Sequence, residues 1–290
     1  MFCGEVLLEV MSMKKSMIVA LGLMAGTVSA QDGVVMVDQG AVYSEAMTEA
    51  TLEVALASSY VWRGQVLNND AVIQPQITLA QYGFSLNMWM NYDIGSNRNG
   101  VQRDVSEFDF SIAYSLPMDI NQMAIDVGLV NYNFPANGTY NTDGLTEGNK
   151  STTEAYLSAT FLSFKDLFIP SVTLFGDFEE VEGTYVLFDV FVPYELSEYV
   201  GLAAGVTAGY GNTKYNDVYW TADGTGDFEG EFSDYSLYAT ASYEVSDRLT
   251  AGVTLNYSML NGDSFKNGAT AAGYEADDKV WGSLNVAYDF

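Results

Sequence analysis

The sequence predicts an all-β protein, an antiparallel transmembrane β-barrel of about 12 strands with short periplasmic turns and longer extracellular loops. Three observations predict this fold. An export signal stands near the start of the chain, and no later apolar run reaches the roughly 18 residues that a membrane-spanning helix needs. Stretches of about ten residues then alternate apolar and polar side chains, which is typical of barrel strands.

The composition excludes several classes of function. The chain has 290 residues, and 11 Lys and Arg against 38 Asp and Glu give a net charge of −27, which argues against a nucleic-acid partner. Because the chain has no His and one Cys, His-based triads, His metal sites and Cys-rich zinc sites are excluded. Only carboxylate chemistry remains, and a paired-carboxylate hydrolase is a third interpretation of the acidic residues. We expect no enzyme activity, no metal site and no cofactor.

Residues 1–30 are predicted to be a signal peptide. Lys14 and Lys15 precede an apolar stretch that ends in small residues at Ala30, where cleavage is expected. The first residues carry Glu5 and Glu9 where a signal peptide is positive, so Met13 is the expected true start. Residues 31–50 show no period and are expected to form a periplasmic tail, with the barrel spanning 51–290.

The alternation template places the strands in order along the chain. The expected strands are 51–64, 71–81, 83–94, 105–116, 122–133, 152–163, 167–178, 183–194, 199–210, 233–244, 248–260 and 279–290. In the third strand, for example, Phe84, Leu86 and Met88 alternate with Ser85 and Asn87. The same pattern recurs at 107–116, 249–260 and 279–290, so one face of each strand should contact lipid and the other the lumen.

Connections alternate between short and long, as they do in barrels whose two chain ends lie in the periplasm. Short connections are expected near Gln81, Pro117, Lys165, Ser197 and Asp247. The longest loop, about 211–233, is acidic, and its segment 223–227 only faintly resembles a calcium loop. A solvated acidic loop is the simpler interpretation.

A soluble β-sandwich also has alternating strands, but its polar face would carry frequent charges. Here that face is mostly Ser, Thr, Asn, Gly and Ala. Tyr288 and Phe290, preceded by Val286 and Leu284 at alternate positions, are expected to form the signal that the barrel assembly machinery reads. Both observations favour a bacterial outer-membrane location, with outer-membrane lipid and lipopolysaccharide as surroundings.

One stretch resembles a known family. The segments 58–64 (SSYVWRG), 74–77 (QPQI) and 82–89 (YGFSLNMW) resemble the opening of the TorF-like family of outer-membrane porins. The resemblance covers about 40 residues and is architectural beyond them. It implies a small outer-membrane barrel with a channel role, and it supplies no catalytic residues.

Strand parity predicts which residues line the lumen. In the first strand Leu52, Tyr60 and Trp62 are expected to face lipid, and Glu53 and Arg63 the lumen. The expected pore-lining residues are Glu53, Arg63, Asp93, Glu107, Asp109, Asp126, Asp177, Asp189 and Asp289, with Asp234 at the end of a loop. Arg63 either neutralises carboxylates in a packed interior or lines a constriction, and both interpretations can hold.

The excess of interior carboxylates predicts a cation preference, since Asp and Glu rings attract cations. The inward series Gly201, Ala203, Gly205, Thr207 and Gly209 is expected to relieve crowding in a narrow barrel. The expected function is therefore passive diffusion of small solutes through an outer-membrane porin or channel. The alternative is a structural or adhesive barrel with acidic, cation-binding loops, whose lumen is occluded by Trp89, Tyr156, Phe191 and Trp281.

Overall fold

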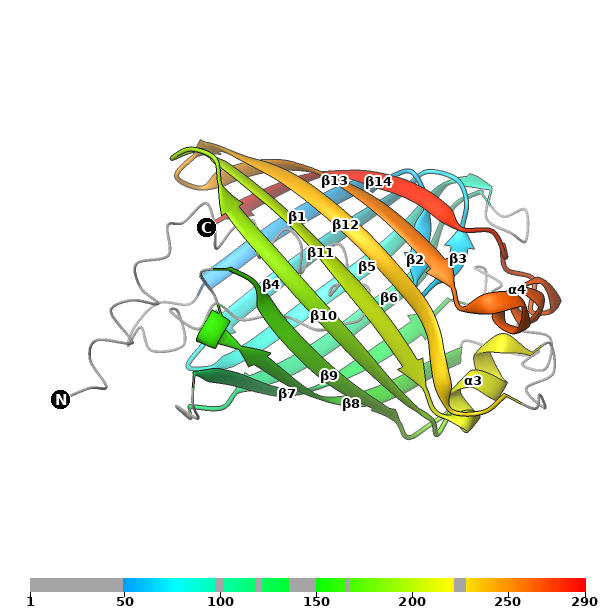
Figure 1. The fold of residues 1–290 in the computed structure, drawn as a ribbon. Helices are drawn as coiled ribbons and strands as arrows, with labels where there is room; N and C mark the ends of the chain where they lie inside the picture. The colour runs from blue at the N-terminus through cyan, green and yellow to red at the C-terminus, as the bar shows by residue number, and fades with distance from the viewer. Residues whose placement is uncertain (1–48, 97–101, 118–121, 136–149, 165–166, 222–227) are drawn as a thin grey trace.

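A computed structural model describes residues 49–96, 102–117, 122–135, 150–164, 167–221 and 228–290 (Figure 1). The expected signal peptide and most of the expected tail, with Met13, lie outside these residues, as does the segment 223–227. Residues 49 and 50 already belong to the first strand. In the described part of the chain, no helix is long and apolar enough to cross a membrane.

Twelve antiparallel strands close into a barrel. They are β1 (Glu49–Ala57), β4 (Val72–Gln81), β5 (Phe84–Ser96), β6 (Gln102–Ser115), β7 (Met123–Phe134), β8 (Lys150–Phe161), β9 (Ile169–Asp177), β10 (Thr184–Glu195), β11 (Val200–Gly211), β12 (Glu231–Ser246), β13 (Leu249–Leu260) and β14 (Lys279–Asp289). Neighbours in the sheet are neighbours in sequence, and closure pairs β1 with β14, with Leu52 opposite Tyr288. The Phe290 N–H donates to the Ala50 carbonyl at 3.0 Å and extends this seam.

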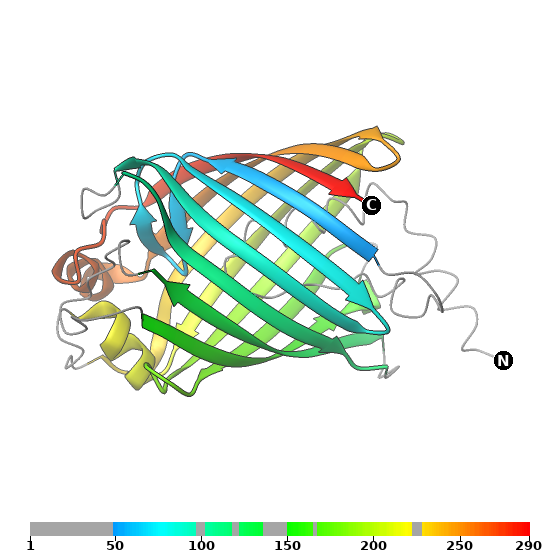
Figure 2. The same cartoon turned by 180° about the vertical axis from the view of Figure 1, so that it is seen from behind.

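The barrel has two unlike ends. One end carries the C-terminus and the short connections, such as 82–83 and 247–248, and is called the turn end (Figure 2). The other end carries the long connections and two helices, and is called the loop end. The expected alternation of short and long connections is confirmed, and eleven of the expected strands lie within three residues of the observed bounds.

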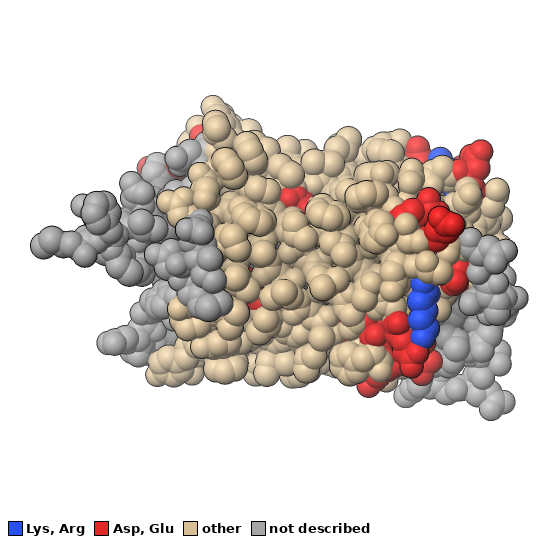
Figure 3. Space-filling model, turned by 60° about the horizontal axis from the view of Figure 1, so that its bottom comes forward, with Lys and Arg blue, Asp and Glu red and all other residues tan. Residues whose placement is uncertain are grey.

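The outer surface is apolar around the whole barrel. Each strand exposes at least one large apolar side chain: Leu52, Ile77, Leu86, Phe110, Leu129, Leu157, Leu174, Phe188, Val206, Leu237, Val253 and Leu284. The side chains between them, such as Asn87 and Thr254, are buried, so the predicted division of faces is confirmed. Figure 3 shows a middle zone that is almost free of charge, with Asp, Glu, Lys and Arg gathered near the loop end.

The first expected strand, 51–64, is too long. β1 ends at Ala57, and the chain then forms a small separate hairpin of β2 (Tyr60–Trp62) and β3 (Gln65–Asn68) (Figures 1 and 2). We call residues 58–70 the inner hairpin, because the side chains of 59–63 and 65–68 are buried against lumen-facing residues of the wall. The expectation that Tyr60 and Trp62 face lipid is therefore wrong: they are 0% and 7% exposed.

The turn of the inner hairpin explains why the expected strand 51–64 cannot be one straight strand. Arg63 and Gly64 have φ values of 45° and 78°. Two successive positive φ values are the signature of the tight type I′ turn, which reverses a chain within two residues. A Cβ on Gly64 would also lie 2.6 Å from the Cβ of Asp234, so no larger residue fits between the turn and β12.

Two helices lie at the loop end and were not predicted. They are α3 (Thr213–Trp220) and α4 (Gly262–Ala271). A 3-10 turn, η2 (Leu162–Phe164), lies at the turn end. The Asn212 side chain caps α3 by accepting from the Tyr215 N–H at 2.9 Å. Trp220 and Phe265 hold the helices together edge to face, with ring centroids 5.5 Å apart.

Small residues on β11 make room for aromatic rings from neighbouring strands. A Cβ on Gly205 would lie 2.2 Å from the Tyr238 hydroxyl, and one on Gly209 would lie 2.0 Å from the Tyr185 hydroxyl. Tyr238 in turn donates to Asp189 at 2.9 Å. The structure thus supports crowding relief as the role of this series.

This packing predicts a large difference between two Gly→Ala substitutions. Gly205→Ala should lower the free energy of unfolding by about 1–3 kcal/mol, because the rigid Tyr238 ring must move. Gly176→Ala is the matched control, since a Cβ there meets nothing within 4 Å. Urea titration of the heat-modifiable folded form measures both. Equal destabilisation by the two substitutions would contradict the close packing of Tyr238.

Candidate functional site

The interior of the barrel is strongly acidic. Among the described residues the buried acidic side chains are Glu53, Asp93, Glu107, Asp109, Asp126, Glu154, Asp177 and Asp234, and the buried basic side chain is Arg63. Asp189 and Asp289, also expected in the lumen, are half-buried. Carboxylates removed from water need hydrogen bonds or a counter-charge, so the partners of each one decide what it can do.

Three of these carboxylates hold the inner hairpin. The Tyr60 hydroxyl donates to Glu107 at 2.8 Å, and the Asn68 amide donates to Asp93 at 2.6 Å. Arg63 makes two parallel bonds to Glu154, at 2.9 and 2.8 Å. The hairpin is therefore docked on β5, β6 and β8 by buried hydrogen bonds, and the Arg63–Glu154 pair among them is charge-assisted, which is one of the stronger kinds.

Arg63 lies in an aromatic cage. Its guanidinium carbon is 4.4 Å from the ring centroids of both Phe175 and Tyr185, 4.5 Å from that of Trp62 and 5.7 Å from that of Tyr215. The Tyr215 hydroxyl accepts from Arg63 at 3.2 Å, and the Tyr132 hydroxyl donates to Glu154 at 3.1 Å. Arg63 thus pairs a carboxylate inside a packed interior, which is one of the two interpretations of the sequence.

Glu154 is the residue that sequence reasoning missed. It lies two residues before Tyr156, on the same face of β8, and both side chains are buried. Strand parity alone was sufficient to find it, since the expected strand 152–163 already placed Tyr156 inside. Strand parity also predicted that Arg63 faces inward. Arg63 is buried, but it lies in a turn and not in a strand, so its burial does not follow from strand parity.

The tyrosines of α3 complete the cage from the loop end. Burial raises the pKa of the Tyr215 hydroxyl well above its usual value, and the nearby Arg63 charge only partly offsets this. Burial likewise raises the pKa of Tyr219, whose ring lies 5.3 Å from that of Trp62. Both phenols therefore remain neutral, and Glu154 supplies the negative charge that faces Arg63.

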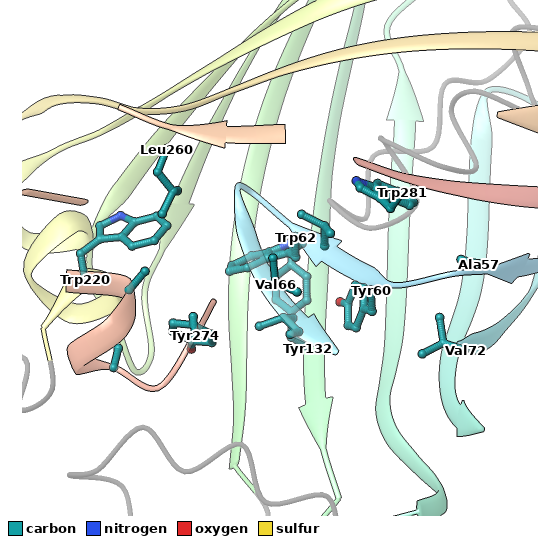
Figure 4. Packing of buried hydrophobic residues seen from close by; sticks show 14 of the residues in the cluster. Ala57, Tyr60, Trp62, Val66, Val72, Tyr132, Trp220, Leu260, Tyr274 and Trp281 are labelled. Carbon is teal, nitrogen blue, oxygen red and sulfur yellow. The ribbon is translucent and has the colours of Figure 1, made fainter. Parts of the chain in front are cut away.

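An apolar cluster surrounds the polar anchors (Figure 4). Val61, Val66 and Leu67 of the inner hairpin pack with wall residues that include Trp89 and Trp281. The cluster continues through Leu260 to Trp220, Phe265 and Tyr274 at the loop end. Hairpin, wall and helices therefore form one continuous apolar plug in the loop-end part of the barrel.

The segment after α4 ties the plug to the barrel rim. Val66 forms a β-bridge with Glu275, and the Asn69 amide donates to the Glu275 carboxylate. Lys266 donates to Asp278 at 2.8 Å, and this bond lowers the pKa of the Asp278 carboxyl. The two side-chain contacts of Glu275 and Asp278 are exposed, so each contributes little by itself.

Other predicted residues are engaged in the wall. The Asp177 carboxylate accepts the N–H groups of Glu179, Val181 and Glu182 at 2.9 to 3.0 Å and so fixes the 178–183 loop. Asp234 accepts from Tyr185 and Ser233, at 3.2 and 2.6 Å. These two carboxylates are thus occupied by structural hydrogen bonds.

The remaining predicted carboxylates do not meet at one place. Four of them accept a side-chain hydrogen bond from a neighbour: Glu53 from Gln76, Asp126 from Ser115, Asp189 from Tyr238 and Asp289 from Thr51. Neither oxygen of Asp109 has a hydrogen-bond partner among the described residues. Tyr288 and Phe290 lie on the outer face near the turn end, with ring centroids 5.0 Å apart, and their assembly role stays a prediction.

Metal-binding groups do not gather in the part of the chain that the structure describes: no three Asp, Glu, His or Cys side chains there could hold one ion. What the site offers is a single guanidinium, several separate carboxylates and many aromatic rings. Such a set can bind and orient a cationic or neutral solute by charge and stacking.

Comparison with known proteins identifies a family. A family model described as "Bacterial protein of unknown function (Gcw_chp)" matches residues 42–281. The chain belongs to this family. The match includes the inner hairpin, α3, α4 and the barrel strands up to the first residues of β14. No curated protein matches the chain.

Several solved outer-membrane barrels are similar in fold. The NanC porin has a TM-score of 0.50 at 12% identity, over 82% of this chain and 98% of its own. LpxR from Salmonella typhimurium also has a TM-score of 0.50, at 10% identity, over 82% of this chain and 99% of its own. The KdgM porin covers 83% of this chain and 99% of its own at 10% identity, with a TM-score of 0.47. Identities this low show the fold alone.

The docking of Arg63 predicts unequal effects of two charge removals. Arg63→Met leaves Glu154 buried and unpaired, so it should destabilise the closed form by about 3–5 kcal/mol. Lys214→Met, in the exposed pair with Glu182, should cost less than about 1 kcal/mol. Hydrogen exchange of the 60–68 amides measures the loss of docking directly. Unchanged protection in Arg63→Met would contradict the anchoring role of the pair.

Proposed function

We propose that the protein is an outer-membrane channel for small solutes, with a cation-preferring lumen and with its extracellular mouth closed by the inner hairpin in this conformation. The observation that carries the proposal is the acidic interior of a closed barrel: eight buried carboxylates against one buried guanidinium among the described residues. Once water enters and these carboxyls ionise, a lumen with that excess of acidic groups attracts cations and repels anions.

The outer surface supports membrane insertion. A continuous ring of exposed Leu, Ile, Val and Phe is unsuited to water and matches the apolar band of outer-membrane barrels. We place the turn end in the periplasm and the loop end outside the cell, because short turns and both chain ends face the periplasm in such barrels. Outer-membrane lipid, lipopolysaccharide and the barrel assembly machinery are the partners that this placement implies.

The TorF-like affiliation belongs to the same proposal. The Trp62-Arg63-Gly64 segment that carries the resemblance forms the turn of the inner hairpin. The resemblance implies the same channel role that the acidic interior supports.

The second candidate is a non-conducting barrel with a structural or adhesive role. The specific observation in its favour is the continuous apolar plug of hairpin, wall and helices. The polar anchors argue for a removable plug, since Glu107, Asp93 and Glu154 would become hydrated lumen groups once the hairpin left. Conductance separates the two candidates.

Removal of the inner hairpin should open the channel. A variant with residues 59–69 replaced by a short Gly-Ser link should conduct several-fold more than the wild type in planar bilayers. Its reversal potential in a KCl gradient should report a cation preference that falls as ionic strength rises, because salt screens the carboxylates. A folded but silent deletion variant would support the structural barrel, and an anion-selective one would refute the acidic lumen.

Cysteine labelling tests the orientation. Because the expected mature chain begins after Ala30 and has no Cys, Glu180→Cys in the 178–183 loop should react with an impermeant maleimide on intact cells. Asp247→Cys, in a short turn, should react only after the outer membrane is permeabilised. Both native side chains are exposed, so accessibility within the fold is matched. The reverse pattern would invert the proposed orientation.

A further inference from the structure

We propose that the cage around Arg63 is a binding site for solutes that carry a guanidinium group, and that Arg63 is its intramolecular occupant. The site binds such a solute when the inner hairpin withdraws, and the solute competes with Arg63 for it. In naming a solute class this inference rests on the proposed channel, although binding itself can be measured without conduction.

Most of the cage belongs to the barrel and not to the hairpin. Glu154 comes from β8, Phe175 from β9 and Tyr185 from β10, and Tyr132 of β7 orients the Glu154 carboxylate. Tyr215 comes from α3. Only Trp62 is contributed by the hairpin, so withdrawal leaves a carboxylate, two stacking rings and two phenols in place. The receptor is therefore built before any solute enters.

The geometry fits a guanidinium better than other cations. Two parallel N–H···O bonds to Glu154 use the fork of a planar guanidinium, which an ammonium ion lacks. Phe175 and Tyr185 centroids at 4.4 Å supply faces against which a flat cation stacks. Anions are disfavoured, because two further buried carboxylates lie close by, Asp109 near Glu154 and Asp234 near Arg63.

Arg63, the occupant, has a strained backbone conformation that withdrawal of the hairpin would relieve. Arg63 has a φ of 45°, in the left-handed region that favours Gly and Asn. The turn would form more readily with Gly or Asn at position 63. The arginine side chain is therefore present although the backbone conformation there disfavours it. A free guanidinium carries no such strain, and by occupying the cage it would shift the population toward the withdrawn hairpin.

Chemical rescue tests the site in the full-length folded barrel. Arg63→Gly removes the occupant and suits the positive φ, so the turn should survive. Calorimetry in detergent should show that guanidinium, at millimolar concentration, binds the single variant Arg63→Gly. Its affinity for the double variant, which carries Arg63→Gly and Glu154→Gln, should be at least about tenfold lower. Urea, which has the same shape without the charge, and ammonium, which has the charge without the fork, should bind Arg63→Gly more weakly than guanidinium does.

The outcomes are distinct. Equal affinity for guanidinium in the single and double variants, or no binding to folded Arg63→Gly, would overturn the site. Arg63→Asn is the second variant if Arg63→Gly does not fold. In the wild type, guanidinium chloride must raise the hydrogen-exchange rate of the 60–68 amides above the rate in KCl at the same concentration. Binding without conductance would refute the channel and keep the site, whereas conductance without binding would do the reverse.

Discussion

The ion pair between Arg63 and Glu154 determines how the loop end of this barrel is organised. Both side chains are almost wholly buried, at 1% and 2% exposure. Removing two charged groups from water has a large unfavourable desolvation free energy. Two parallel hydrogen bonds, a tyrosine donor and four surrounding rings offset that cost. Because Arg63 is at the tip of the hairpin, the pair fixes the position of the turn, and Tyr60 and Asn68 then reach their own carboxylates.

The barrel wall does not depend on this pair. Its strands are held by a closed ladder of backbone hydrogen bonds that runs from β1 through β14 without an edge. The plug is held by side chains, a few polar anchors and an apolar cluster. Two parts of one chain thus have unlike stabilities, and the hairpin can loosen while the wall remains intact.

The sequence predicted the wall well, because period-two alternation reports which side of a strand is apolar. Val253 and Leu255 face out and Thr254 and Asn256 face in, as expected. The same signal failed at Tyr60 and Trp62, since an apolar residue in a plug and one in lipid give the same pattern. The helices α3 and α4 were missed because they are short and lie in loops whose composition indicated only turns. Asp177 was correctly placed inside, but its use as a loop anchor depends on backbone N–H groups that no side-chain pattern reveals.

The chemistry of the plug explains how an acidic lumen can also be a closed one. A purely apolar plug would leave an apolar pore on withdrawal, and water or ions would enter such a pore with difficulty. Here the hairpin covers Asp93, Glu107 and Glu154, and each accepts a hydrogen bond from it. Withdrawal would exchange those bonds for bonds to water or to a solute donor, so the free-energy difference between closed and open forms is smaller than the plug's buried area implies. In the proposed channel, the carboxylates that hold the hairpin are thereby the groups that would favour cations in the open form.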